Sequence, residues 1–128
     1  MIDIYVDGAS KDNNVKGAIR RASICVIVPQ YNFKLVEPIG NKTNNEAEWD
    51  ALVKALEIAS REHWKNIRIL SDSQLVVEQF NDRWRCKHEN LETSYLCAKT
   101  LACLFDKLEV VWIRRNKNLA GIELERMG

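Results

Sequence analysis

The feature that most constrains the fold is a change of hydrophobic periodicity near residue 43. Before that point, three segments carry the alternating or β-branched apolar residues of strands, and they span residues 2–7, 22–28 and 33–36. From residue 43 onward, apolar residues recur every three or four positions over 47–59, which is one face of an amphipathic helix. A meander of three strands followed by a long helix indicates a sheet with helices packed on it.

The rest of the chain alternates between strands and helices. Apolar runs at 67–70 and 108–113 have the length of buried strands, and helical spacing marks 75–80, 91–102 and the segment from Leu119 onward. The order β-β-β-α-β-α-α-β-α therefore predicts an α/β fold with a mixed sheet and helices on its faces.

Composition and charge are those of an ordinary globular protein. Of the 128 residues, 46% are hydrophobic and 29% are charged, a balance that argues against disorder, and no apolar run approaches the roughly 20 residues of a membrane helix. The first residues show no basic flank before an apolar core, so we expect no secretory signal, and no linker or repeat divides the chain. We therefore expect a single domain over 1–128, cytoplasmic and monomeric, with no membrane contact and no obligate protein partner. Because the net charge is only +1, nucleic-acid binding would depend on local basic clusters.

The four cysteines show neither a C-x-x-C pair nor zinc-finger spacing; they are Cys25, Cys86, Cys97 and Cys103. With no secretory signal, reduced thiols are the better interpretation. We expect three or four of them to fill the core.

Three acidic residues stand where a sheet of this kind usually binds ligands. Asp7 is expected to end the first strand, Asp72 ends the fourth, and Glu48 lies in the first turns of the long helix. Strand ends line the ligand crevice of an open sheet, so the two aspartates would share it if the first and fourth strands are neighbours. Clustered carboxylates repel one another unless a divalent cation joins them, and magnesium or manganese suits such oxygen ligands. Taken singly, each residue is better explained as a turn former or a helix N-terminal acid.

The contexts of these residues resemble type 1 ribonuclease H. Three motifs occur in that family's order, IYVDGAS over 4–10, TNNEAE over 43–48 and SDSQ over 71–74, and the resemblance continues over 80–91. It covers nearly the whole chain and implies a ribonuclease H-like fold, a five-stranded mixed sheet with three antiparallel and two parallel strands and helices on both faces. The short chain resembles the compact archaeal-type and bacterial members, which lack an inserted basic helix and an N-terminal hybrid-binding domain.

The resemblance also implies an activity and a metal site. Members of the family hydrolyse the RNA strand of RNA/DNA hybrids with two divalent ions, Mg²⁺ or Mn²⁺, leaving 3′-hydroxyl and 5′-phosphate ends. The family's metal-binding carboxylates fall on Asp7, Glu48 and Asp72. Glu46 sits at the variable position of its motif, so we exclude it from the site.

The residues expected to contact the hybrid lie in the same motifs. By the resemblance, polar contacts to the minor groove fall on Asn44, Asn45 and Gln74. Thr43 matches the residue that helps to hold a phosphate of the DNA strand. An aromatic contact with that strand falls on Phe80 or Trp84, and we favour Trp84 because Phe80 has the helical spacing of a core residue. Two basic clusters supply local positive charge: Arg83, Arg85, Lys87 and His88, and then Arg114, Arg115 and Lys117.

The fourth position of the family's site departs from the pattern. The family carries N-x-x-A-D at the start of the last helix, whereas here Ala120 is followed by Gly121 and no aspartate. The preceding loop looks shortened, which would bring Asn118 near the metals, where its amide oxygen could act as a neutral ligand. Its structural alternative is a simple N-cap, and Glu123 and Glu125 are competing ligands. The missing carboxylate leaves a catalytically weak or silent hybrid-binding protein as the second hypothesis.

Overall fold

The computed structural model describes residues 1–11 and 19–128, and its elements follow the expected order. The strands are β1 (Ile2–Lys11), β2 (Arg21–Val28), β3 (Phe33–Gly40), β4 (Asn66–Ser71) and β5 (Lys107–Trp112). The helices are α1 (Asn44–Arg61), α2 (Gln74–Phe80), α3 (Glu89–Ala102) and α4 (Leu119–Met127). Two short 3-10 turns are η1 (Pro29–Tyr31) and η2 (Arg115–Lys117).

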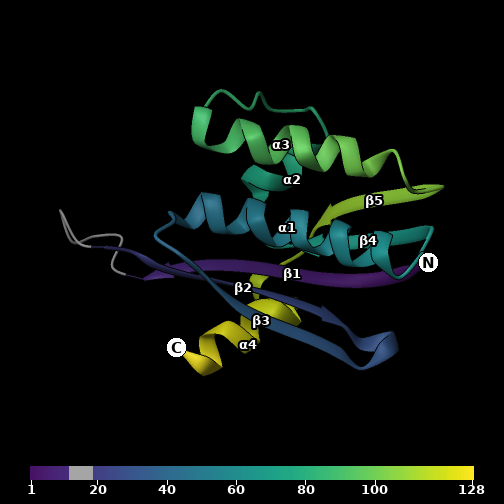
Figure 1. The fold of residues 1–128 in the computed structure, drawn as a ribbon. Coiled ribbons are helices and arrows are strands. Elements are labelled where there is room, and N and C mark those ends of the chain that lie inside the picture. Colours follow the sequence, from purple (N-terminus) through teal and green to yellow (C-terminus); the bar gives the residue numbers. More distant parts are fainter. Residues whose placement is uncertain (12–18) are drawn as a thin grey trace.

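The five strands form one mixed sheet in the order β3-β2-β1-β4-β5. The pairs β3–β2 and β2–β1 are antiparallel, whereas β1–β4 and β4–β5 are parallel. Helices α1, α2 and α3 cover one face, and α4 packs against β1 and β2 on the other (Figure 1). The mixed sheet with helices on both faces is therefore confirmed, and β1 and β4 are neighbours.

One boundary differs from the expectation and matters for the site. Asp7 does not end β1, because antiparallel pairing with β2 keeps β1 extended as far as Lys11. The parallel pairing with β4, however, stops at Val6 opposite Ser71. Asp7 is thus the first residue of β1 beyond the end of β4, level with Asp72, which follows that end.

The core lies between the sheet and α1. The helix buries an apolar face at the expected spacing: Ala47, Trp49, Ala51, Leu52, Ala55, Leu56, Ile58 and Ala59. The indole N–H of Trp49 donates to Oε1 of Gln79 at 2.9 Å, so this buried polar pair is satisfied and joins α1 to α2. The buried apolar face of α1 holds the N-terminal end of the helix against the middle of the sheet.

All four cysteines are free thiols, but they do not all fill the core. Cys25 is buried in β2, and burial raises the pKa of its thiol to about 12. Cys86 is half-buried, while Cys97 and Cys103 are exposed. The expectation of three or four core cysteines is therefore wrong, because Cys97 lies outside the buried stripe of α3 and Cys103 follows the end of that helix.

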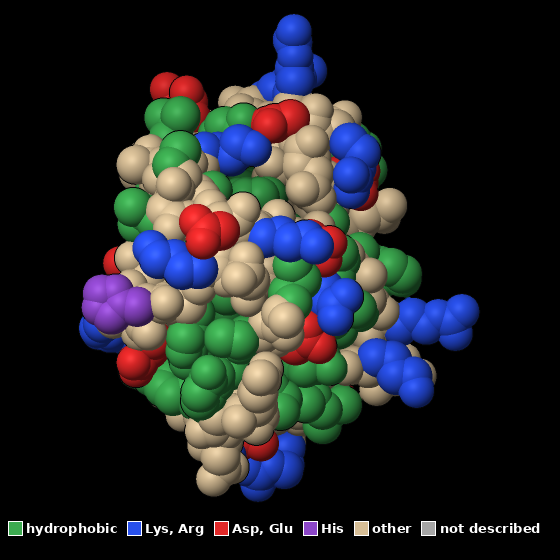
Figure 2. Space-filling view, turned by 90° about the vertical axis from the view of Figure 1, so that its right-hand side faces the viewer, with side chains coloured by type: hydrophobic (Ala, Val, Ile, Leu, Met, Phe, Trp, Pro, Cys, Tyr) green, Lys and Arg blue, Asp and Glu red, His purple; other side chains and the backbone are tan. Residues whose placement is uncertain are grey.

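The end of the molecule that carries the N-terminus also holds the β2–β3 and α1–β4 connections (Figure 1). Tyr31 and Trp64 come from these two connections, and their rings stack with centroids 4.8 Å apart. On this face basic and acidic side chains are interspersed around exposed hydrophobic ones (Figure 2). Among the described residues, no helix combines the length and the apolar character needed to cross a bilayer.

Candidate active site

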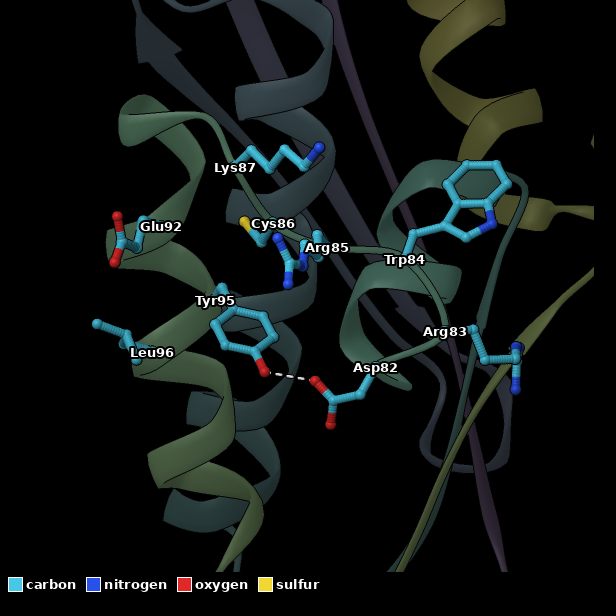
Figure 3. A pocket seen from close by; sticks show the side chains of 9 residues that line it. All are labelled: Asp82, Arg83, Trp84, Arg85, Cys86, Lys87, Glu92, Tyr95 and Leu96. Atoms are coloured by element: carbon cyan, nitrogen blue, oxygen red, sulfur yellow. Dashed lines mark hydrogen bonds between the residues drawn. The ribbon is translucent and has the colours of Figure 1, made fainter.

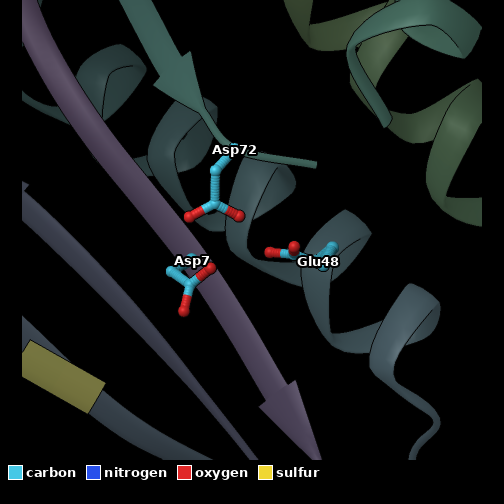
Figure 4. Close-up of side chains that lie close together, drawn as sticks. All are labelled: Asp7, Glu48 and Asp72. Carbon is cyan, nitrogen blue, oxygen red and sulfur yellow. The ribbon is translucent and has the colours of Figure 1, made fainter. Parts of the chain in front are cut away.

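Three carboxylates converge from three different elements (Figure 4). Asp7 comes from β1, Glu48 from the N-terminal part of α1, and Asp72 from the residue after β4. Each offers an oxygen, and these oxygens all lie within 4.8 Å of one another. The parallel β1–β4 pairing brings the two aspartates together, and the packing of α1 on β1 adds the glutamate. The three residues named by the motifs thus form one cluster, which we call the acidic cluster.

Gly8 permits the close approach of α1 to β1. A Cβ at this position would lie 2.2 Å from the backbone carbon and oxygen of Ala47, so no side chain fits. The Gly8 N–H donates to Oε1 of Glu48 at 2.7 Å, which orients that carboxylate toward Asp7. Nothing in the local sequence distinguishes this role from a turn glycine, because the contact comes from a helix forty residues away.

Burial and repulsion between neighbouring carboxylates disfavour the ionised forms of Asp7 and Glu48. The pKa of Asp7 is raised to about 7, chiefly by burial and then by the charge of Asp72. The pKa of Glu48 is also well above its ordinary value, because of burial and the neighbouring charge of Asp7. A divalent cation would replace the retained protons and offset the repulsion, and these hard oxygen donors match Mg²⁺ or Mn²⁺. The donor set therefore fits the metals that the motifs imply.

A hollow of about 170 Å³ opens over the acidic cluster and is also lined by Asn44, Asn45 and Arg115. The Nε of Arg115 donates to Oε1 of Glu125 at 3.2 Å, and this contact raises the pKa of the guanidinium. The sequence predicted Arg115 only as one member of a basic cluster. The structure places its positive charge beside the carboxylates.

The polar residues at the start of α1 cap the helix and tie it to β1. The Thr43 hydroxyl accepts from the Glu46 N–H at 3.1 Å, and the Glu46 carboxylate accepts from the Thr43 N–H at 2.8 Å. This capping box occupies Glu46, which lies outside the acidic cluster, as its motif position implies. Asn44 accepts from the Ser10 N–H at 2.7 Å, which ties the helix start to β1.

The two aromatic alternatives for DNA-strand contact have different environments. Phe80 is only 6% exposed and packs in the core, whereas Trp84 is 45% exposed. Trp84 lies on the loop between α2 and α3, beside a hollow of about 350 Å³ also lined by Arg85 and Lys87 (Figure 3). Of these two alternatives, Trp84 is therefore the one that a ligand can reach.

The loop that carries Trp84 is anchored to α3. Asp82 accepts from the Tyr95 hydroxyl and from Nζ of Lys99, the latter at 2.7 Å. The same Nζ donates to the Phe80 carbonyl at 2.8 Å. Gln74, the first residue of α2, is exposed on the stretch between Asp72 and this loop.

Asn118 lies at the N-cap of α4 and is fully buried. Its Oδ1 accepts from the Ala120 N–H at 3.2 Å. Its Nδ2 donates to the Val6 carbonyl at 2.9 Å and to Oδ2 of Asp72 at 3.0 Å. Asn118 therefore touches the acidic cluster, as expected, although through its amide nitrogen. Direct metal ligation by its oxygen stays a prediction.

The two competing glutamates are occupied elsewhere. Glu123 pairs with Lys34 at 3.0 Å and with Arg126 at 2.6 Å, and these cations lower the pKa of its carboxyl to about 2. Glu125 pairs with Arg115. Within the described ranges 1–11 and 19–128, neither glutamate belongs to the group of carboxylates that could hold an ion.

Comparison with known families agrees with the motifs and the geometry. Residues 6–127 match the family model described as "Reverse transcriptase-like". The chain belongs to the reverse transcriptase-like family.

Two curated relatives of this chain are longer proteins. The bifunctional protein Rv2228c of Mycobacterium tuberculosis is 38% identical over 82 residues, which cover 64% of this chain and 22% of that protein. Ribonuclease HI of Halobacterium salinarum is 32% identical over 120 residues, covering 91% of this chain and 58% of that protein.

Solved structures show the same fold over nearly the whole chain. The crystal structure of RNase H1 from Halobacterium salinarum has a TM-score of 0.81 at 29% identity, covering 96% of this chain and 92% of that one. The crystal structure of LC11-RNase H1 in complex with an RNA/DNA hybrid has a TM-score of 0.80 at 25% identity, covering 97% and 93%. The resemblance of this reverse transcriptase-like chain to type 1 ribonuclease H is therefore confirmed.

Proposed function

We propose that this chain is an endonuclease that hydrolyses the RNA strand of RNA/DNA hybrids, leaving 3′-hydroxyl and 5′-phosphate ends. One observation carries the proposal: three carboxylates in ribonuclease H motif contexts converge within 4.8 Å below a hollow. The similarity to LC11-RNase H1, which was crystallised with an RNA/DNA hybrid, supports this class of substrate. We further propose that the chain acts as a monomer.

Asp7, Glu48 and Asp72 would hold two divalent ions, Mg²⁺ or Mn²⁺. When bound, such ions lower the pKa of a water molecule and stabilise the charge that develops on the leaving oxygen. Asp7 interacts with both of the other carboxylates, so it would help to hold the ions together with each of them. Gly8 holds Glu48 in place through its N–H, so the protein orients the ligands before any substrate arrives.

The groups around the acidic cluster suit a hybrid duplex. Asn44 and Asn45 border the hollow, and Gln74 begins the helix that follows Asp72, so the amide groups come from the first turns of α1 and α2. Amides can donate to and accept from base edges and the 2′-hydroxyl, which distinguishes RNA from DNA. Arg115 supplies a positive charge for a phosphate. In this proposal the Thr43 hydroxyl contacts a DNA-strand phosphate while it caps α1.

A labelled RNA/DNA hybrid tests the proposal directly. The purified chain should cleave it with Mg²⁺ or Mn²⁺ and leave duplex RNA and duplex DNA intact, and excess EDTA should stop the reaction. Cleavage in excess EDTA, or equal cleavage of duplex DNA, contradicts the proposed activity. Hybrid binding without any cleavage would favour the second hypothesis, a silent hybrid-binding protein, although the intact acidic cluster argues against it.

Trp84→Ala is expected to weaken hybrid binding roughly tenfold, because stacking or packing on an exposed aromatic contributes about 1–3 kcal/mol. Binding is measured with Ca²⁺ in place of the active metal so that no cleavage occurs. The effect should appear in KM more than in kcat, since Trp84 lies away from the acidic cluster.

Trp64→Ala is the matched control. Trp64 is also a partly exposed tryptophan, but it stacks on Tyr31 at the end of the molecule that carries the N-terminus. Its replacement should leave hybrid affinity unchanged. Equal affinities of both variants and the unmodified protein would remove Trp84 from the proposed interface.

A further inference from the structure

The hydrogen bonds of Asn118 determine which end of its amide faces the acidic cluster. Two of its three partners are oxygens that only accept, the Val6 carbonyl and Oδ2 of Asp72, and the third is the Ala120 N–H, which only donates. A flipped amide would place Oδ1 against both oxygens and the NH₂ group against an N–H. All three contacts would then be repulsive in a fully buried position, so the nitrogen must face Asp72.

An amide NH₂ group donates hydrogen bonds and offers a cation no lone pair. We propose that Asn118 is a positioning residue, which orients the Asp72 carboxylate for the metal site and supplies no ligand oxygen itself. This inference rests on the proposed function for its catalytic meaning, but the contact it describes does not.

The hydrogen bond from Asn118 to Asp72 is one of several contacts between the start of α4 and the aspartate-bearing segments. Asp72 follows the last residue of β4, and the Nδ2 group of Asn118 donates to its Oδ2. The same amide holds the carbonyl of Val6, the residue before Asp7. One side chain therefore connects the start of α4 to both aspartate-bearing segments. A Cβ at Gly121 would lie 3.2 Å from Oδ2 of Asp72 and 3.5 Å from Cγ of Asp7, so the first turn of α4 packs closely here.

Two variants separate the positioning role from the helix cap and from direct ligation. Asn118→Ser keeps an N-cap acceptor but is too short to reach Asp72. Asn118→Asp keeps the size and the cap, yet it replaces the donor by a carboxylate that faces Asp72. If Asn118 were a ligand, the aspartate would keep or strengthen metal binding, because it adds a charged oxygen at the same place.

The first readout needs no substrate: the affinity of the protein for Mn²⁺, from the electron paramagnetic resonance signal of free Mn²⁺. We expect Asn118→Ser to bind Mn²⁺ three- to tenfold more weakly. Leu124→Ala, on the same helix, controls for loss of α4 stability and should bind Mn²⁺ like the unmodified protein. Unchanged Mn²⁺ affinity in Asn118→Ser overturns the proposal, whether or not the chain cleaves hybrids.

The second readout is the division of the effect between kcat and KM on a hybrid at saturating Mn²⁺. Both Asn118 variants should lower kcat at least tenfold with KM unchanged within twofold, because Asn118 orients Asp72 and does not touch the hybrid. An Asn118→Asp variant with unmodified kcat would show that an oxygen serves at this position and would overturn the positioning role. Absence of cleavage by the unmodified chain refutes the proposed function alone, since the Mn²⁺ measurement still tests the contact.

Discussion

Asp7→Asn is expected to lower kcat for hybrid cleavage at least roughly a thousandfold, because metal-bound charge stabilisation contributes several kcal/mol and each 1.4 kcal/mol is about tenfold. Asp7 is the carboxylate that interacts with both Glu48 and Asp72, so its loss affects every ion the cluster would hold. Single-turnover cleavage of a labelled hybrid at saturating metal measures the effect. Glu48→Gln and Asp72→Asn should be similarly inactive.

The same substitution should stabilise the metal-free protein at neutral pH and above. The pKa of Asp7 is raised from 3.8 to about 7 in the folded state, so its contribution to stability is present below pH 4 and is lost as the pH rises through 7. The amide of the Asp7→Asn variant does not titrate. Urea unfolding in EDTA should show the variant more stable by on the order of 1–3 kcal/mol at pH 8 and nearly equal to the unmodified protein at pH 4. An equal difference at both pH values would show that repulsion is not the cause.

Glu46→Gln is the control for the cleavage measurement. It removes a carboxylate two residues from Glu48 but keeps the capping box, in which glutamine also serves. Activity and its dependence on metal should stay within twofold of the unmodified protein. A Glu46→Gln variant as inactive as Glu48→Gln would move the metal site to the other glutamate of the motif.

Gly8→Ala is expected to destabilise the fold by about 3 kcal/mol or more and to abolish cleavage. This loss of stability lies at or above the usual range for core substitutions, because the added atom would be packed against rigid atoms. The added Cβ would meet the backbone of Ala47 at 2.2 Å, and a backbone cannot move aside as a flexible side chain can. Retreat of α1 would carry Glu48 away from Asp7. Urea unfolding and the Mn²⁺ affinity of the remaining folded protein measure the two effects.

Gly40→Ala is the comparison that separates a clash from backbone strain. Gly40 has a φ of +83° with nothing within 4 Å of the added Cβ. Its replacement should cost only about 1–2 kcal/mol, the strain of a left-handed conformation, and should leave Mn²⁺ affinity unchanged. Equal losses of stability and metal affinity in both variants would contradict the role assigned to the α1–β1 contact.

Local patterns in the sequence determined the order of the elements, and the resemblance to type 1 ribonuclease H named the three carboxylates. Periodicity of two or of about 3.6 is a property of neighbouring residues, so strands and helices such as β4 and α1 could be predicted within a few residues. The motif contexts then singled out Glu48 over Glu46, and the capping box in the structure accounts for the second glutamate. Asp72 was predicted to end the fourth strand, and it lies one residue beyond the end of β4.

Only the tertiary structure decided the features that depend on distant segments. Pairing with β2 extends β1 beyond Asp7, and the packing of α1 excludes a side chain at Gly8. Arg115 lies beside the acidic cluster because β5 pairs in parallel with β4, so the segment after β5, which carries Arg115, starts at the same edge of the sheet. Asn118 turns its nitrogen to Asp72 because Val6 and Asp72 both present oxygens there. The sequence could name an asparagine at the fourth position, but which amide atom faces the site depends on partners 112 and 46 residues away.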